Sequence, residues 1–145
     1  MLFHDFVSFV LRSPLHRLLS KATMLVTMTG RKTGTPVTLP VNYIQDGSQL
    51  FTISQRNRVW WRNLRGGASV ILRLRGQDVV ATGKVVEIPA EVGRELCVFV
   101  QKRAPAYQKY LKIDMLPDGT PSPASLEKVA QERVFIVFDL THGNG

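Results

Sequence analysis

A short run in the first third of the chain combines the residue types that bind anions. Gly30 and Gly34 enclose the basic pair Arg31-Lys32, with threonines on both sides. Glycine permits positive-φ turns whose backbone N–H groups converge, and a neighbouring cation adds charge-assisted hydrogen bonds worth roughly 1.5–3 kcal/mol each. The spacing matches neither the phosphate-binding loop of nucleoside triphosphatases nor the glycine pattern of dinucleotide-binding folds. The run alone is therefore as typical of a plain basic hairpin turn as of an anion site.

The positive charge of the chain is concentrated around this run. The net charge is +8, and residues 30–77 hold eight Lys or Arg residues against one acid, Asp46, so this segment carries +7. A local positive field attracts nucleic acid, a membrane surface or a multiply charged small molecule, and a solvated basic face is the simplest alternative. Nucleic-acid binding needs aromatics interleaved with cations on a sheet face. Because the tryptophans stand together at Trp60-Trp61, no nucleic-acid partner is expected.

Other catalytic constellations are missing from the sequence. His4, His16 and His142 lack the spacing of metal ligands, so no metal site is expected. The single cysteine, Cys97, stands among apolar residues as an inert buried thiol would. An anion site and aromatics without acid–base machinery favour an enzyme whose cofactor supplies the reactivity.

The elements that must position these residues follow an antiparallel α+β pattern. Asp46-Gly47 between two apolar runs is a strong hairpin signal, and Pro40, which cannot donate to a ladder, places the second strand at an edge or a bulge. Strands in hairpin order with few intervening helices predict a sheet curled into a small barrel. Six strands are predicted, over residues 23–29, 36–44, 49–53, 70–75, 79–88 and 134–140.

Helices are predicted around this sheet. Two short N-terminal helices within residues 1–21 meet near Ser13-Pro14, and their apolar faces pack on the core or contact a membrane or a partner. Further helices are expected over residues 58–65, 90–102 and 106–112, whereas the proline-rich residues 114–125 predict a loop.

The length of the chain, 145 residues, fits one domain. No apolar run is long enough to span a bilayer, and the beginning of the chain has no positive region or cleavage site typical of a signal peptide. A cytoplasmic protein is therefore expected, with membrane association through the N-terminal helix as a further possibility.

Taken together, the motifs resemble those of the deazaflavin-dependent nitroreductase family. The resemblance covers residues 13–110 and the final strand, and it rests on the run from Thr29 to Pro36, the Asp46-Gly47 hairpin, Ser54, Trp60-x-x-Asn63-Leu64 and Ala106-Tyr107-Gln108-Lys109-Tyr110. It implies a six-stranded split β-barrel of the FMN-binding type and a homodimer. The implied activity is hydride transfer from reduced deazaflavin coenzyme F-420 to a quinone-like or nitro-aromatic acceptor.

The resemblance also implies site residues. Ser54 or Tyr107 would donate a proton to the acceptor, and Tyr107 and Tyr110 would line the hydrophobic substrate side. Where the family usually has Lys-Gly-Gly after the serine, this chain has Gln55-Arg56-Asn57-Arg58, so either arginine could replace that lysine. The coenzyme would contact Arg31, Lys32, Thr33, Gly34, Pro40, Ser54, Arg56, Arg58, Trp60 and Asn63.

The sequence leaves open which other ligand the same barrel could bind. The departure after Ser54 leaves FMN, FAD or heme as alternative cofactors. A non-catalytic carrier of a hydrophobic anion such as a fatty acid would use the same features, since it also needs an apolar cavity beside a cation.

Overall fold

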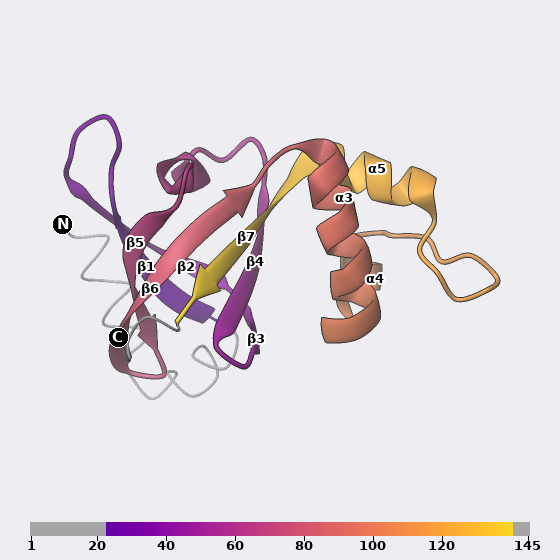
Figure 1. Ribbon diagram of the computed structural model, residues 1–145, viewed down its shortest axis with the longest axis horizontal. Coiled ribbons are helices and arrows are strands. Elements are labelled where there is room, and N and C mark those ends of the chain that lie inside the picture. The colour runs from indigo at the N-terminus through magenta and orange to yellow at the C-terminus, as the bar shows by residue number, and fades with distance from the viewer. Residues whose placement is uncertain (1–22, 141–145) are drawn as a thin grey trace.

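The computed structural model describes residues 23–140, whose strands form one antiparallel sheet (Figure 1). Its seven strands are hydrogen-bonded in the order β2-β1-β5-β6-β7-β4-β3. The strands are β1 (Thr23–Thr29), β2 (Pro36–Asn42), β3 (Ile44–Asp46), β4 (Gln49–Gln55), β5 (Ala68–Leu74), β6 (Gln77–Val86) and β7 (Arg133–Asp139). The two predicted N-terminal helices, and the membrane contact considered for them, lie outside the described residues.

The prediction of a single strand over residues 36–44 is wrong, and this raises the number of strands from six to seven. β2 pairs with β1 at one edge of the sheet and β3 pairs with β4 at the other, yet only Tyr43 separates β2 from β3. Consecutive Cα atoms lie about 3.8 Å apart. The two edges must therefore meet, and the sheet curls into a half-open barrel, as the antiparallel α+β pattern predicted.

The barrel is left open between β2 and β4. β3 covers β4 only from Gln49 to Phe51, so residues 52–55 of β4 have β7 on one side and no described strand on the other. The predicted edge position of Pro40 is confirmed, since β2 ends the sheet, and its ring nitrogen has no hydrogen to offer to β4. One hydrogen bond spans the opening, from Thr52 Oγ1 to the Asn42 carbonyl at 2.9 Å.

Two hydrophobic cores lie on the two faces of the curled sheet. The inner core fills the barrel and includes both tryptophans. The outer core lies where helices cover β4 and β7, and its centre is the aromatic cluster of Phe51, Phe99 and Phe135, with ring centroids 5.6–6.0 Å apart. The covering elements are α3 (Pro89–Val98), η2 (Phe99–Arg103), α4 (Tyr107–Tyr110) and α5 (Pro123–Glu132) (Figure 1). No helix among the described residues is long and apolar enough to cross a bilayer.

The helix α5 corrects the end of the loop predicted over residues 114–125. The prolines of that stretch indicated a break, but Pro123 stands in the first turn of α5, where its missing N–H has no partner to lose. Ser122 caps the helix by accepting from the Ser125 N–H at 3.3 Å. Residues 114–122 form a loop as predicted, closed by a bridge between Met115 and Pro121, and only residues 123–125 of the stretch are helical.

Three further predictions need adjustment. The strand predicted to end at Ile53 continues to Gln55, so Ser54 lies within β4 and not in a loop after it. The helix predicted over residues 58–65 is the shorter 3₁₀ helix η1 (Trp60–Leu64). The helix predicted over residues 90–102 changes after Val98 into the π-helical turn η2, in which the Ala104 N–H donates to the Phe99 carbonyl at 2.8 Å.

Gly83 allows η1 to close the end of the barrel. A Cβ atom at this position would lie 3.1 Å from Leu64 Cδ2 and 3.1 Å from Phe138 Cε1. Leu64 is the last residue of η1 and is fully buried. The missing side chain of Gly83 therefore sets how deeply η1, and with it Trp60, sits in the barrel.

Replacing Gly83 with alanine is expected to destabilise the protein. The added methyl group must displace buried side chains, and such overpacking costs about 1–3 kcal/mol. Gly93→Ala is the matched control, because Gly93 lies inside α3 with no atom within 4 Å of its Cβ position. This control should be neutral or stabilising by up to about 1 kcal/mol. Urea unfolding measures both, and equal stability of the two variants would contradict the packing argument.

Candidate functional site

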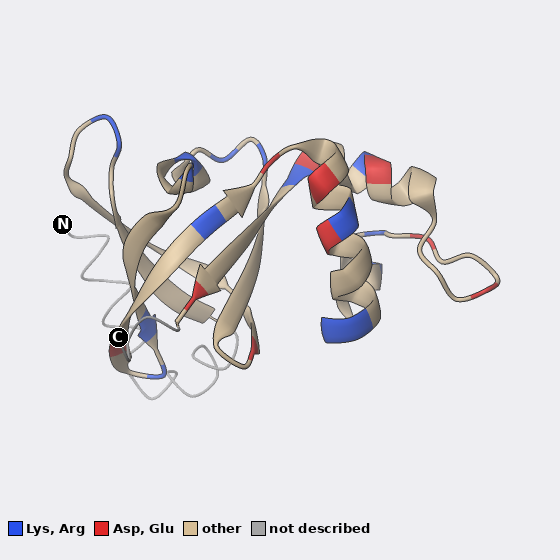
Figure 2. Ribbon diagram, in the orientation of Figure 1, with Lys and Arg blue, Asp and Glu red and all other residues tan. Residues whose placement is uncertain are grey.

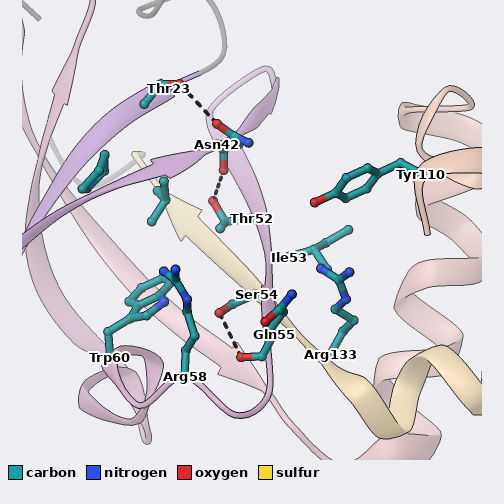
Figure 3. Close-up of a pocket in the computed structure, with 12 residues that line it drawn as sticks. Thr23, Asn42, Thr52, Ile53, Ser54, Gln55, Arg58, Trp60, Tyr110 and Arg133 are labelled. Atoms are coloured by element: carbon teal, nitrogen blue, oxygen red, sulfur yellow. Dashed lines mark hydrogen bonds between the residues drawn. The ribbon is translucent and has the colours of Figure 1, made fainter.

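The opening between β2 and β4 holds a cavity of about 370 Å³ (Figure 3). Its walls are residues 40–42 of β2 and 52–55 of β4, and side chains from Thr23, Arg58, Trp60, Tyr110 and Arg133 complete them. The cavity thus lies where the ladder between the two strands is interrupted. A volume of this size is typical of small-molecule sites.

The polar groups on the floor of the cavity come from β4. Thr52 and Ser54 are the buried polar residues of the described chain, 5% and 6% exposed. Strand alternation places both on the same face as Leu50, which belongs to the inner core. The Ser54 hydroxyl donates to the Gln55 carbonyl at 3.2 Å and points toward the Trp60 side in Figure 3. A hydroxyl that is almost fully buried can hydrogen-bond to a ligand with less competition from bulk water than an exposed one.

Each of the two side walls of the cavity has an aromatic ring and an arginine. Figure 3 shows Trp60 and Arg58 on one side of β4 and Tyr110 and Arg133 on the other. The Arg133 guanidinium lies 5.7 Å from the centroid of the Tyr110 ring. No carboxylate of residues 23–140 lines the cavity. The cavity therefore combines flat apolar walls with positive charge, which suits an aromatic ligand that carries an anionic group.

The basic turn predicted as an anion site joins β1 to β2. Its glycines shape it as expected: the Gly34 N–H donates to the Gly30 carbonyl at 2.8 Å, and Gly34 has φ +74°. The N–H groups of Gly30 and Gly34 are used inside the turn, whereas those of Lys32 and Thr33 donate to no atom of the described residues. The Lys32 side chain likewise has no ion pair there.

Asn63 connects this turn to the wall of the cavity. Its Oδ1 accepts from the Arg31 N–H at 2.9 Å, and its Nδ2 donates to the Trp60 carbonyl at 3.0 Å. The Arg31 guanidinium adds a bond to the Arg62 carbonyl at 3.3 Å. The cationic turn is thus fixed to η1, whose first residue, Trp60, forms one wall. Figure 2 shows the cations of the turn, of η1 and of the loop before η1 along the same edge of the barrel.

The structure brings only part of the predicted site into the cavity. Pro40, Ser54, Arg58, Trp60 and Tyr110 line it. Four predicted coenzyme contacts, residues 31–34, lie exposed on the turn, and Asn63 stands between the turn and the cavity.

Two other predicted residues have structural contacts instead of a place in the cavity. The Arg56 Nη2 donates to the carbonyls of Ala130 and Arg133 at 2.8 and 3.0 Å, so this side chain holds the junction of α5 and β7. Tyr107 packs behind Tyr110, with its ring 5.3 Å from Phe99 and 5.7 Å from Tyr110.

Comparison with known proteins identifies the family of this chain. A family model described as F420H(2)-dependent quinone reductase matches residues 11–115. The chain belongs to this family. The match includes the basic turn, η1 and β1 to β6, together with α3 and α4. The family in which the sequence motifs were placed, one of deazaflavin-dependent reductases, is therefore confirmed.

Solved structures confirm the fold. A protein from Mycobacterium smegmatis described as FAD and heme binding is 12% identical, covers 90% of this chain and 68% of its own, and superposes with a TM-score of 0.51. A proposed pyridoxamine 5′-phosphate oxidase from Listeria innocua is 11% identical, covers 86% of this chain and 88% of its own, and gives a TM-score of 0.50. At these identities the likeness concerns the fold, a curled antiparallel sheet of the split-barrel type.

Sequence reasoning missed five polar residues that line the cavity: Thr23, Asn42, Thr52, Gln55 and Arg133. Asn42 and Thr52 were read only as strand residues, although both are polar positions in otherwise apolar runs, which was a usable signal. Arg133 stands outside the basic segment and precedes the last strand, so only the pairing of β7 with β4 brings it beside Gln55.

The bond between Arg31 and Asn63 is expected to hold the turn in place. Asn63→Ala removes the acceptor and should cost about 1 kcal/mol of stability while speeding hydrogen exchange at the Arg31 amide. Asn63→Asp is the matched control, because it keeps an oxygen acceptor for Arg31. Amide exchange followed by NMR checks both variants. Unchanged protection of Arg31 in Asn63→Ala would show that the turn is held by other contacts.

Tyr107 is expected to make the folded protein less stable at alkaline pH. Burial, with a smaller contribution from Tyr110, raises the pKa of Tyr107. The folded state therefore favours the neutral phenol. The contribution of the neutral phenol to stability is complete below the unfolded-state pKa of about 10. It is lost as the pH rises through the pKa of the folded state. Urea unfolding at pH 7 and above pH 10 should show a smaller alkaline loss for Tyr107→Phe than for the unsubstituted protein, and identical losses would contradict the assignment.

Proposed function

We propose that the protein is an oxidoreductase that uses reduced coenzyme F-420 to reduce a quinone-like or nitro-aromatic acceptor. The observation that carries this proposal is the bond of Asn63 to both the exposed cationic turn and the Trp60 wall of the cavity. Membership of the F420H(2)-dependent quinone reductase family supports the same cofactor.

The residues present fit a coenzyme with a flat ring and a polyanionic tail. The Lys32 side chain, and the N–H groups of Lys32 and Thr33, which have no partner among residues 23–140, offer charge-assisted hydrogen bonds to phosphate or carboxylate oxygens. Arg31, Thr33 and Gly34 would support the same contact. Trp60 and Pro40 offer flat apolar surface to the ring inside the opening. Arg58, exposed on the loop between β4 and η1, adds positive charge between the two regions.

The reactivity would belong to the coenzyme, which supplies a hydride when it is bound in reduced form. The chain would position both reactants and limit water around them. The curled sheet encloses the floor of the cavity, and the buried Ser54 hydroxyl there would turn from the Gln55 carbonyl to a ligand oxygen. We assign Ser54 the role of hydrogen-bond donor to an oxygen of the acceptor, with solvent replacing any proton that its hydroxyl transfers. Tyr107, which was predicted for the same role, would act by supporting the Tyr110 ring.

Titration of the purified protein with F-420, and separately with FMN, tests the proposed cofactor. F-420 should bind at micromolar concentration and quench the fluorescence of the tryptophans. Lys32→Gln should weaken this binding about tenfold or more, because it removes one charge-assisted contact. Lys128→Gln is the matched control, since Lys128 is also exposed but lies on α5. Oxidation of reduced F-420 in the presence of menadione or a nitro-aromatic compound then reports turnover.

Three outcomes would contradict the proposal. Binding of FMN without F-420 would identify a flavin protein instead. Absence of binding by either cofactor, together with a fatty acid that co-purifies in native mass spectrometry, would favour a carrier. Equal effects of Lys32→Gln and Lys128→Gln would remove the turn from the site.

A further inference from the structure

We propose that Arg133 selects an acceptor that carries an anionic oxygen, so that the substrate class is aromatic or quinoid rings bearing a carboxylate or an ionised hydroxyl. That the ligand is an electron acceptor rests on the proposed function. The binding preference itself rests only on the cavity and applies to any flat ligand that occupies its Tyr110 side.

Arg133 has a charge that the described residues do not neutralise. The arginines Arg65, Arg73 and Arg103 each contact a carboxylate at 2.9–3.0 Å. The Arg133 side chain forms no ion pair with residues 23–140, although it is partly buried and lines the cavity. A partly buried guanidinium without a carboxylate is poised to bind one from a ligand.

The backbone of Arg133 is fixed in place. Its carbonyl accepts from the Arg56 Nη2 at 3.0 Å, and the same nitrogen donates to the Ala130 carbonyl at 2.8 Å. The Arg56 N–H donates to the Glu132 carbonyl at 2.8 Å, and Arg133 stands opposite Gln55 in the ladder of β4 and β7. The peptide segment 132–133 is thus held both by Arg56 and by the ladder with β4. Arg133 can therefore bind a ligand without first ordering its own backbone, which reduces the entropic cost of binding.

The chemical class of the ligand follows from the neighbours of Arg133. The guanidinium lies over the Tyr110 ring, and the apolar side chain of Ile53 lines the cavity beside them. Figure 3 shows the Tyr110 hydroxyl directed toward the opening between β2 and β4. A flat ring can lie against Tyr110 and Ile53 while its anionic oxygen reaches Arg133. A neutral ring would make the same apolar contacts without this charge-assisted bond.

The Arg133 side is separate from the cations assigned to the coenzyme. Trp60 belongs to the inner core, whereas Tyr110 contacts Tyr107, which packs on the outer core. The basic turn is fixed to η1 on the Trp60 side through Asn63. The coenzyme tail and the acceptor anion would therefore be bound at different ends of the cavity region, and a ligand of each kind could bind together.

The test compares two ligands of equal shape and different charge, 2-naphthoate and 2-naphthamide. Their dissociation constants are measured by NMR titration, first with the protein alone and then with saturating F-420. Naphthoate should bind about tenfold tighter than naphthamide, the preference expected from one charge-assisted contact. It should also bind with F-420 present.

Variants assign this preference to Arg133. Arg133→Gln should bring the two dissociation constants together mainly by weakening naphthoate, and Arg133→Lys should restore part of the preference. Arg103→Gln is the matched control: Arg103 also lies over an aromatic ring, 4.8 Å from the Phe51 centroid, but it pairs with Asp46 and does not line the cavity. Amide NMR spectra establish that each variant keeps the fold.

Each contrary result has a defined meaning. Equal affinity for the two ligands in the unsubstituted protein, or no binding of either, overturns the proposal. Loss of the preference in Arg103→Gln assigns it to general surface charge. Displacement of naphthoate by F-420 assigns Arg133 to the coenzyme tail and overturns its role toward the acceptor. If F-420 does not bind but naphthoate is preferred through Arg133, the proposed function fails while the anion site stands.

Discussion

The structure depends on the single residue, Tyr43, that separates the two edge strands of the sheet. Because β2 and β3 are consecutive in the chain yet lie at opposite edges, the sheet has to curl. It cannot close, because β3 is short and Pro40 offers no N–H toward β4. The remaining opening is bridged by the Thr52 hydroxyl and the Asn42 carbonyl. An opening of this kind exposes a strand edge inside a protected concave surface, and the candidate site occupies it.

A series of short contacts connects this opening to the cationic turn. Gly83 leaves room for Leu64, so η1 can seat Trp60 against the barrel. Asn63, one turn later in η1, bonds to the backbone of the turn. The position of the cations therefore depends on packing inside the barrel as well as on local turn geometry. This coupling gives a short turn the fixed position that binding of a coenzyme tail requires.

Some cations of the described residues form ion pairs and others do not. Arg65, Arg73 and Arg103 form exposed ion pairs, which contribute little to stability at a protein surface. Lys32, Arg58 and Arg133 have no such partner among the described residues, and they surround the cavity and its approach. A protein that gathers unpaired cations around an apolar opening favours ligands that are flat and anionic. Both the coenzyme and the acceptor proposed above meet this description.

The sequence by itself determined the features that depend on local chemistry. The glycine-bounded basic turn, the strands around Asp46-Gly47 and the edge position of Pro40 could be predicted, since each depends on residues close together in the chain. The family could be predicted because each of its motifs is a short run of neighbouring residues. The helix α5 was missed because proline marks a helix start as well as a break, and the π-turn at Phe99 has no sequence signal of its own.

Only the tertiary structure decided which of these residues share the cavity. It placed Ser54 inside a strand, turned Arg56 toward the α5–β7 junction and set Tyr107 behind Tyr110. It also brought Arg133 beside Gln55, across 78 positions of the chain, through the ladder of β4 and β7. The physical reason is that strand pairing between distant segments is set by burial of whole sheet faces. Burial of this kind depends on all the strands together and cannot be read from any one of them.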